Sequence, residues 1–253
     1  MDPAGKTAVV TGGASGLGAA VAAALAEAGA QVAVLDRAAP ADGGAFFQCD
    51  VTDAASAEAA IAAVMARFGR IDLCVNCAGI GGIGAIATPQ GPQDLDDFRR
   101  VIDVNLIGTV NVTRLAAHHM MANAGDGPDG ERGVILNAAS IASFEGQQGM
   151  GAYAASKAAV AALTLVWARD LAAHHIRVVS IAPGFFATPM TAGLPESFVE
   201  DLLTTMEYPK RAGRPEEFAA LALFVIRAAL INGETIRLDG ATRPPPRTLW
   251  TAA

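Results

Sequence analysis

Tyr153 and Lys157 are the first residues in this chain whose types and spacing suggest chemistry. The segment from Ala152 to His175 is rich in alanine and contains neither Gly nor Pro, so it is predicted to be a helix. Residues at i and i+4 share one face of a helix, which would place the Lys157 ammonium beside the Tyr153 phenol. A phenol that acts as acid and base near neutral pH needs a pKa lowered by roughly three units, about 4 kcal/mol, and a nearby cation acts in that direction. We therefore expect Tyr153 to exchange a proton with a substrate oxygen.

Two further polar residues adjoin apolar runs. Ser140 follows the segment Val134–Ala139, which is typical of a buried strand that opens into a loop, and its hydroxyl could bind the oxygen that Tyr153 protonates. Asn105 lies in an apolar stretch, where a buried amide needs hydrogen-bond partners. Asn105 either relays protons through water toward Lys157 or only satisfies backbone groups. A tyrosine and a lysine alone would be an ordinary surface pair, so catalysis depends on the surrounding elements.

A glycine-rich turn near the N-terminus predicts a dinucleotide site. The short apolar strand Thr7–Val10 leads into this turn, and an alanine-rich helix follows it to Ala28. A strand, a glycine turn and a helix N-terminus present free backbone N–H groups to a pyrophosphate. The glycines Gly12, Gly16 and Gly18 are spaced as T-G-x-x-x-G-x-G rather than G-x-G-x-x-G.

Acidic residues end the next two predicted strands. Asp36 follows the strand Gln31–Leu35, and a carboxylate there would accept hydrogen bonds from ribose hydroxyls and repel a 2′-phosphate. We therefore expect NAD rather than NADP, although Arg37 beside it could pair with a phosphate. Asp50 follows the strand Ala45–Cys49 and could accept from the adenine amino group while Val51 packs on the ring. Helix capping is the alternative role for Asp50.

The later strands end in segments that suit the same ligand. Ile71–Val75 leads into Asn76, Ala78 and Gly79, a tight turn at a strand's carboxyl end, and Ile176–Ala182 breaks at Pro183-Gly184. Thr188 could bond a nicotinamide carboxamide or cap a helix. We expect the Gly/Pro-rich loop between Ile80 and Leu95 to edge the substrate opening. The apolar residues between Pro189 and Arg211 form either a lid or part of the core.

Composition and the order of elements define the fold class. Strands alternate with helices, which predicts a Rossmann-type doubly wound parallel sheet in a three-layer α/β/α arrangement, as one domain over residues 1–253. The 253 residues are 52% hydrophobic, enough for a large core, and the net charge of −7 disfavours a nucleic-acid surface. The chain has no secretory signal pattern and no long uninterrupted apolar run, so we expect a cytoplasmic protein that does not enter a membrane.

The cysteines and histidines do not predict a redox or metal site. Cys74 and Cys77 form a C-x-x-C motif, but a glycine-rich turn follows it where a thioredoxin-type site requires a helix. The histidines form two adjacent pairs near expected helix ends, where they suit the helix dipole better than a metal ion.

In their order and spacing these motifs resemble the short-chain dehydrogenase/reductases over nearly the whole chain. One departure is Cys77, where most members have a second Asn. The resemblance implies that Ser140, Tyr153, Lys157 and Asn105 are catalytic. It also implies a cofactor site formed by Gly12, Ser15, Gly16, Leu17, Gly18, Asp36, Asp50, Val51, Asn76, Ala78, Gly79, Tyr153, Lys157, Pro183, Gly184 and Thr188.

Segments such as Ser143–Gln147 and Asn232–Ala241 are similar to the type 2 3-hydroxyacyl-CoA dehydrogenases, a 17-beta-hydroxysteroid dehydrogenase type 10-like branch. This resemblance implies an NAD-linked homotetramer that takes hydride from a secondary alcohol. Lys157 would hold the nicotinamide ribose, and Asn105 would connect Lys157 to solvent through a water. The loop before Leu95 carries no Lys or Arg, unlike the more basic loop of that branch. The alternatives are a dehydrogenase of steroids or other hydrophobic secondary alcohols and a non-catalytic NAD-binding scaffold.

Overall fold

Short, mostly apolar strands form the centre of the molecule. The computed structural model describes residues 1–41, 44–194 and 196–246, without the side chains of residues 196–198 and 201. The strands of the main sheet are β1 (Thr7–Thr11), β2 (Gln31–Asp36), β3 (Ala45–Gln48), β4 (Leu73–Asn76), β7 (Gly133–Ala138), β8 (Ile176–Pro183) and β9 (Thr235–Leu238). The α-helices are α1 (Gly16–Glu27), α2 (Ala54–Phe68), α3 (Leu95–Ile102), α4 (Gly108–Met120), α5 (Gly151–Leu171), α6 (Glu196–Thr204) and α7 (Pro215–Arg227).

The seven strands pair in the order β3-β2-β1-β4-β7-β8-β9, and every pairing is parallel. From β1 the chain winds outward to β3, then returns to the other side of β1 and winds outward to β9. The direction of winding therefore reverses between β1 and β4, and open α/β sheets bind ligands at such a reversal. The predicted doubly wound parallel sheet is confirmed.

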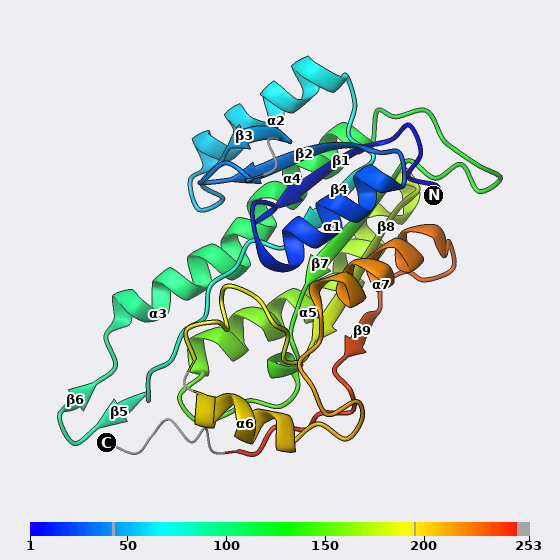
Figure 1. Ribbon diagram of the computed structural model, residues 1–253. Coiled ribbons are helices and arrows are strands. Elements are labelled where there is room, and N and C mark those ends of the chain that lie inside the picture. Colours follow the sequence, from blue (N-terminus) through cyan, green and yellow to red (C-terminus); the bar gives the residue numbers. More distant parts are fainter. Residues whose placement is uncertain (42–43, 195, 247–253) are drawn as a thin grey trace.

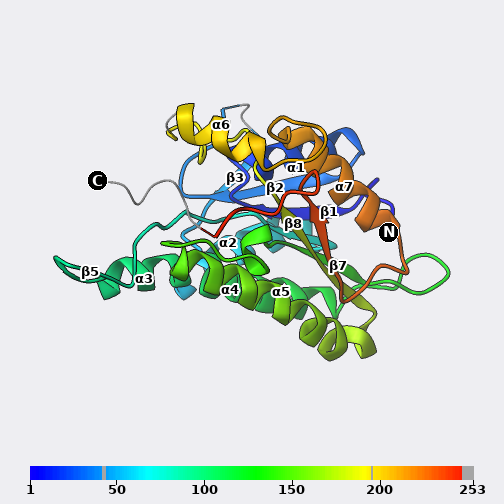
Figure 2. The ribbon, with the colours of Figure 1, turned by 90° about the horizontal axis from the view of Figure 1, so that it is seen from below.

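Alternation along the strands gives the sheet two buried faces. Val9 packs toward α2 and α4, whereas its neighbours Ala8 and Val10 pack toward α1 and α7. Successive side chains of a strand point to opposite faces, so a strand covered on both sides is apolar on both faces for most of its length. Figures 1 and 2 show the result: α1 and α7 cover one face of the sheet, and α2, α4 and α5 cover the other.

The loop predicted between Ile80 and Leu95 contains more structure than its composition suggested. Two-residue strands, β5 (Ala87–Thr88) and β6 (Gly91–Pro92), pair into a hairpin that projects from the body together with α3 (Figure 1). At the base of this projection Gly84 donates its N–H to the Gly149 carbonyl at 2.7 Å, just before α5. The loop therefore lies against the segment that introduces Tyr153.

A one-turn π-helix, Asp103–Ile107, joins α3 to α4 and contains Asn105. π-turns are rare and occur often at functional sites. Helical periodicity alone did not reveal it. The predicted strands agree with the structure to within a few residues, and the long helix ends at Leu171, where a 3₁₀ turn continues to His174.

Candidate active site

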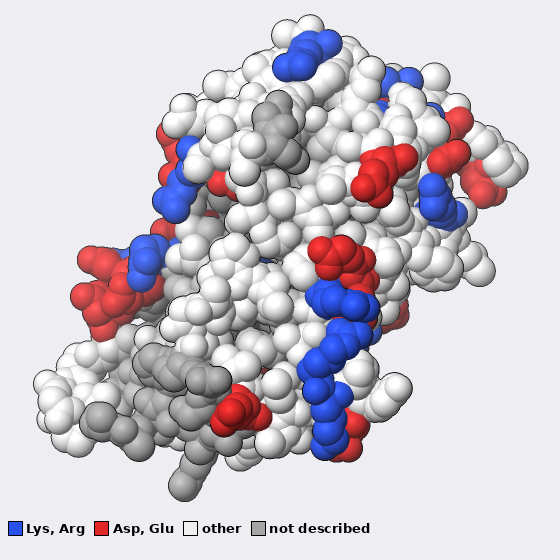
Figure 3. Space-filling model, viewed as in Figure 1, with Lys and Arg blue, Asp and Glu red and all other residues white. Residues whose placement is uncertain are grey.

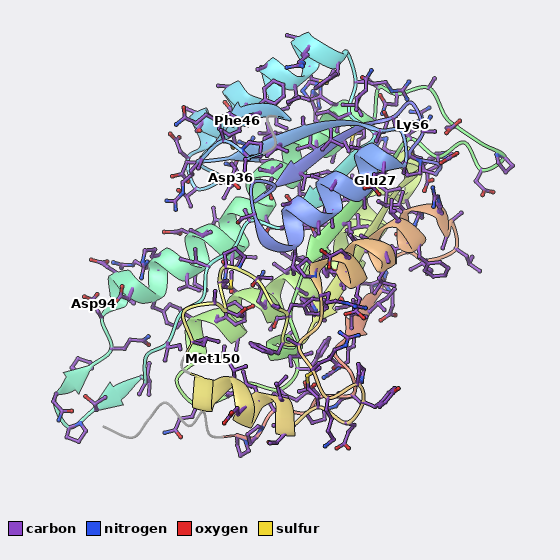
Figure 4. All side chains as sticks on the ribbon, viewed as in Figure 1. Lys6, Glu27, Asp36, Phe46, Asp94 and Met150 are labelled. Carbon is purple, nitrogen blue, oxygen red and sulfur yellow. The ribbon has the colours of Figure 1, made fainter. Side chains whose placement is uncertain are left out.

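A pocket of about 810 Å³ lies at the carboxyl ends of the strands, at the reversal in sheet order. Its volume falls in the range typical of small-molecule and cofactor sites. The glycine turn before α1, the ends of β2 and β3, and the segment after β4 contribute to its wall. The segment after β8 and the start of α5 complete it. Figure 4 shows Asp36 at the end of β2 and Met150 immediately before α5.

The glycine turn is shaped for close contact between backbone and ligand. Gly12 has φ +64°, and a Cβ there would lie 2.8 Å from the Ala78 backbone, so a side chain would push two pocket walls apart. A Cβ on Gly18 would lie 2.2 Å from the Gly12 carbonyl oxygen. Ser15 begins α1 without a side-chain capping bond. The first N–H groups of this helix therefore remain available to an anion such as a pyrophosphate.

Acidic side chains fix the other end of the pocket. One oxygen of Asp36 accepts the Ala14 N–H from the glycine turn at 3.1 Å, and the other accepts the Arg37 N–H at 2.7 Å. The Asp50 carboxylate accepts both the backbone N–H and the hydroxyl of Thr52, which lowers its pKa. Helix α2 is capped by Asp53 instead. Because capping does not require Asp50, its anionic oxygens remain at the pocket wall as predicted.

Ser140, Tyr153 and Lys157 converge on the opposite end of this pocket. The predicted helix is present as α5, and the Lys157 Nζ lies 5.9 Å from the centre of the Tyr153 ring, as the i, i+4 spacing requires. Lys157 is 5% exposed and donates to the Ala138 carbonyl at the end of β7, at 2.7 Å. Ser140 accepts the Ala142 N–H at 3.1 Å in the turn that follows the same strand.

The electrostatics of the pair depart from expectation. Burial raises the pKa of Tyr153, and a hydrogen bond with the Ser140 side chain acts in the opposite direction. Burial also lowers the pKa of Lys157 to about 8. The prediction that Lys157 lowers the pKa of Tyr153 is therefore wrong, because burial raises that pKa instead. The physical reason is that both groups lose solvent and that the ammonium is directed to a backbone carbonyl.

The Asn105 side chain lies behind the pocket wall and makes hydrogen bonds there. It is fully buried, its Oδ1 accepts the Ile80 N–H at 2.8 Å, and its Nδ2 donates to the Ile80 carbonyl at 3.0 Å and to the Ser156 hydroxyl at 3.1 Å. A Cβ on Gly79 would meet Asn105 Oδ1 at 3.3 Å and Lys157 Nζ at 3.5 Å. Of the two predicted roles for Asn105, the side-chain contacts fit the one that satisfies backbone groups. These hydrogen bonds hold the turn at Gly79 next to Lys157.

The model of the family described as short chain dehydrogenase matches residues 6–197 of the chain, a span that includes the glycine turn, Ser140, Tyr153 and Lys157. The chain belongs to the short-chain dehydrogenase family. It is thus an oxidoreductase, and the family implies a nicotinamide nucleotide as cofactor. The glycine cradle and the free N–H groups of α1 fit the pyrophosphate of such a group.

Several relatives of this short-chain dehydrogenase have names that specify substrates. Human 3-hydroxyacyl-CoA dehydrogenase type-2 is 46% identical over 255 residues, which cover 96% of this chain and 97% of the human protein. A crystal structure of 3-hydroxyacyl-CoA dehydrogenase type-2 from Mycobacterium avium superposes with a TM-score of 0.88 at 40% identity, covering 96% of this chain and 97% of the other. A 3alpha-hydroxysteroid dehydrogenase from Mediterraneibacter gnavus is 37% identical over 58% of this chain and 57% of its own.

Two residues predicted for the site of this short-chain dehydrogenase do not line the pocket. One is Asn105, which lies behind its wall. The other is Asn76, which was predicted to bind the cofactor but points into the interior. Its Nδ2 donates to the Thr113 hydroxyl at 3.0 Å and to Asn137 Oδ1 at 2.9 Å. The correction follows from strand alternation, which turns the Asn76 side chain to the α4 face while the backbone after it, at Ala78 and Gly79, reaches the pocket. All other predicted site residues line the pocket, namely Gly12, Ser15, Gly16, Leu17, Gly18, Asp36, Asp50, Val51, Ala78, Gly79, Ser140, Tyr153, Lys157, Pro183, Gly184 and Thr188.

Sequence reasoning missed Ser156 as part of the site. Its hydroxyl donates to the Tyr153 carbonyl at 2.7 Å and accepts from Asn105, so it joins the π-turn to the catalytic helix. A serine three residues after the tyrosine on a buried helix face was the available signal. Burial raises the pKa of Cys74 and Cys77 in the C-x-x-C motif to about 12, which opposes formation of the thiolate that a redox centre uses.

Proposed function

We propose that this dehydrogenase interconverts 3-hydroxyacyl-CoA and 3-ketoacyl-CoA with NAD. The observation that carries the proposal is the convergence of Ser140, Tyr153 and Lys157 on a pocket whose other end is built for a dinucleotide. The near full-length similarity to 3-hydroxyacyl-CoA dehydrogenase type-2 supports this choice of alcohol.

In this mechanism Tyr153 exchanges a proton with the substrate oxygen. The cofactor, when bound, accepts or donates a hydride at its nicotinamide ring. In the reduction, the carbonyl carbon takes up the hydride and its oxygen takes the proton of the Tyr153 hydroxyl, while the Ser140 hydroxyl holds the oxygen in place. The oxidation is the reverse and starts from the Tyr153 phenolate. Lys157, already directed toward the pocket floor by the Ala138 carbonyl, would hold the nicotinamide ribose. Hydrogen bonds through Ser156 and Asn105 hold the turn at Gly79 and Ile80 against α5, the helix that carries Tyr153 and Lys157.

Replacing Tyr153 with Phe tests this mechanism. The change removes the proton donor and keeps the ring, so we expect turnover of acetoacetyl-CoA with NADH to fall about 10²- to 10⁴-fold. Circular dichroism and gel filtration should be unchanged. A Tyr153→Phe enzyme that retains most of its activity would overturn the assignment of Tyr153.

The preference for NAD rests on Asp36. Its carboxylate accepts three backbone N–H groups, from Ala14, Arg37 and Ala38, and a 2′-phosphate placed beside it would meet a negative charge. We expect Asp36→Ser to reduce the ratio of NADH to NADPH kcat/KM about tenfold or more. Arg37→Ala is the matched control, because it removes the adjacent cation that favours a phosphate and should raise the same ratio. A wild-type enzyme that uses NADPH better than NADH would refute the assignment.

A steroid or another hydrophobic secondary alcohol is the second candidate substrate. Phe144 and Met190 are each about half exposed near Ser140 and the pocket wall, and a 3alpha-hydroxysteroid dehydrogenase is among the relatives. A panel that compares CoA thioesters with free ketones separates the two. Acyl-CoA reduction is supported by a higher kcat/KM for thioesters, whereas a higher kcat/KM for free ketones supports the alternative.

The assembly we propose is a cytoplasmic homotetramer. Residues 151–174, formed by α5 and the turn after it, make up one helix long and apolar enough to cross a membrane, but core helices of water-soluble proteins share that property. This helix packs along β8, and only 33% of its apolar window is buried, with Leu165 and Val166 about half exposed. A second subunit packed on this face would bury it. Sedimentation analysis tests the tetramer, and cell fractionation tests the cytoplasmic location.

A further inference from the structure

The two sides of the pocket differ in charge. On one side α3 and its flanks carry the carboxylates of Asp94, Asp96, Asp97 and Asp103 against the guanidinium groups of Arg99 and Arg100. The two arginines pair with acids of their own helix, Arg99 with Asp96 at 3.0 Å and Arg100 with Asp97 at 3.1 Å. Figure 3 shows the red cluster that results over α3. This side of the pocket would repel a polyphosphate.

A column of basic side chains lies on the other side, beside the start of α7 and the loop after β9 (Figure 3). We call it the basic ridge, and its members are Lys210, Arg211, Arg214, Arg237 and Arg243. Three carboxylates are shared among its arginines: Glu217 pairs with Arg211 and Arg214, and both Glu145 and Asp239 pair with Arg237 and Arg243. With the exposed Glu207 and Glu216 included, five carboxylates accompany the five cations, so binding of an anion depends on the cations that lack tight partners.

Part of the basic ridge remains free to bind an anion. Lys210 is exposed and has no ion-pair partner in the described part of the chain. Arg214 reaches Glu217 only at 3.5 Å, and its side chain is 66% exposed. Arg243 is 57% exposed. Exposed cations without tight partners retain donors for phosphate oxygens.

Backbone contacts place the basic ridge at the catalytic end of the pocket. Phe185 and Phe186 line the pocket, and Gly213, next to Arg214, donates its N–H to the Phe185 carbonyl at 2.9 Å. A Cβ on Gly213 would lie 2.7 Å from the Phe186 ring, so the two segments are in contact. On the other wall, Arg237 makes two bonds of 2.7 and 2.8 Å to Glu145, five residues beyond Ser140.

We infer that the basic ridge binds the phosphate groups of the CoA portion of the substrate. The inference rests on the proposed function, which supplies a thioester with three phosphate groups on a long flexible arm. That arm allows the reacting carbon to lie at Ser140 and Tyr153 while the phosphates remain outside the pocket. Tyr208, 84% exposed two residues before Lys210, offers a ring on which the adenine can stack. The acidic side at α3 directs the CoA toward the basic ridge by exclusion.

The double variant Lys210→Ala/Arg214→Ala tests this inference, because neither side chain has a tight partner whose loss would disturb the fold. We expect the KM for acetoacetyl-CoA to rise about tenfold with kcat unchanged. The KM for the acetoacetyl thioester of N-acetylcysteamine, which has the same reacting carbons and no phosphate, should not change. Arg99→Ala/Arg100→Ala on α3 is the matched control and should not raise the KM for acetoacetyl-CoA.

Calorimetric titration of the enzyme with free CoA separates this inference from the proposed function, because binding requires no turnover. We expect wild-type enzyme to bind CoA about tenfold more tightly than the Lys210→Ala/Arg214→Ala variant, and high salt should remove the difference. Equal CoA affinity in the two proteins would overturn the inference even if acetoacetyl-CoA is turned over. Weaker CoA binding by the variant, in an enzyme that reduces only free ketones, would preserve the binding site and reject the proposed substrate.

Discussion

Lys157 and Arg177 are both buried cations, 5% and 6% exposed, but they lie at opposite ends of the sheet and have very different partners. Lys157 lies at the carboxyl end, where it donates to one carbonyl and has no carboxylate partner within the described residues. Arg177 is the second residue of β8, at the amino end. Its guanidinium pairs with Glu131, which also receives the Met1 ammonium at 2.8 Å.

The remaining N–H groups of Arg177 donate to backbone carbonyls at and just beyond the C-terminal end of α7. They reach the carbonyls of Val225, Ile226, Ala228 and Ile231 at 2.7 to 3.2 Å. A buried charge whose hydrogen bonds are all made contributes to a defined structure, whereas one with unmet hydrogen-bonding capacity is available to a ligand. From this difference we expect Arg177 to contribute to stability and Lys157 to act in the proposed chemistry.

Lys157→Met should separate activity from stability most strongly. Removing the cation deprives both the substrate proton transfer and the cofactor ribose of a partner, so we expect kcat/KM to fall about 10³-fold, equivalent to roughly 4 kcal/mol. The free energy of unfolding should stay the same or rise, because an apolar chain of similar length has no charge to desolvate. Steady-state kinetics and urea denaturation measure the two effects. A variant that is active but unstable would reverse the assignment.

Arg177→Met should give the opposite result. It leaves Glu131 with one cation fewer and removes a donor from four carbonyls at and just beyond the end of α7, of which Ile226 keeps the Met1 ammonium and Ala228 keeps the Ile231 N–H. We therefore expect the free energy of unfolding to fall by about 3–5 kcal/mol. The kcat per folded molecule, measured at low temperature with the folded fraction determined by circular dichroism, should match the wild type. Normal stability combined with a reduced kcat would contradict the comparison.

The proximity of Tyr153 and Lys157 could be predicted from the sequence, and the contacts of Arg177 could not. The relation of Tyr153 to Lys157 is local, set by one turn of a helix, and the glycine turn is likewise a contiguous segment. Arg177 acquires its role from carbonyls about 50 residues away along the chain, which no motif marks. The fold could be predicted for the same reason as the pair: strands such as β7 and β8 are buried and mostly apolar because both faces of the sheet are covered.

The orientation and burial of individual side chains could not be predicted from local sequence patterns. The π-turn around Asn105 shifts the helix by a single residue, which helical periodicity does not resolve. The face of the sheet to which the Asn76 side chain points depends on the register of β4 against β7. The raised pKa of Tyr153 comes from the solvent that the surrounding elements exclude, while the sequence shows only the neighbouring cation.

The pH dependence of stability gives the smallest and most specific test of the comparison. Burial lowers the pKa of Lys157 from 10.5 to about 8, so between these values the unfolded chain holds more protons than the folded one. The free energy of unfolding should therefore rise with pH across this window, by up to roughly 3 kcal/mol from this group. The buried thiols make the free energy of unfolding fall with pH, since burial raises the pKa of Cys74 and Cys77 from 9.0 to about 12.

The quantity to measure is therefore the difference in the free energy of unfolding between wild type and Lys157→Met, determined by urea denaturation from pH 7 to 10.5. Arg177→Met should keep the wild-type slope, because a guanidinium does not titrate there. Identical slopes in wild type and Lys157→Met would show that the buried ammonium is already fully stabilised, and the distinction between the two cations would then fail.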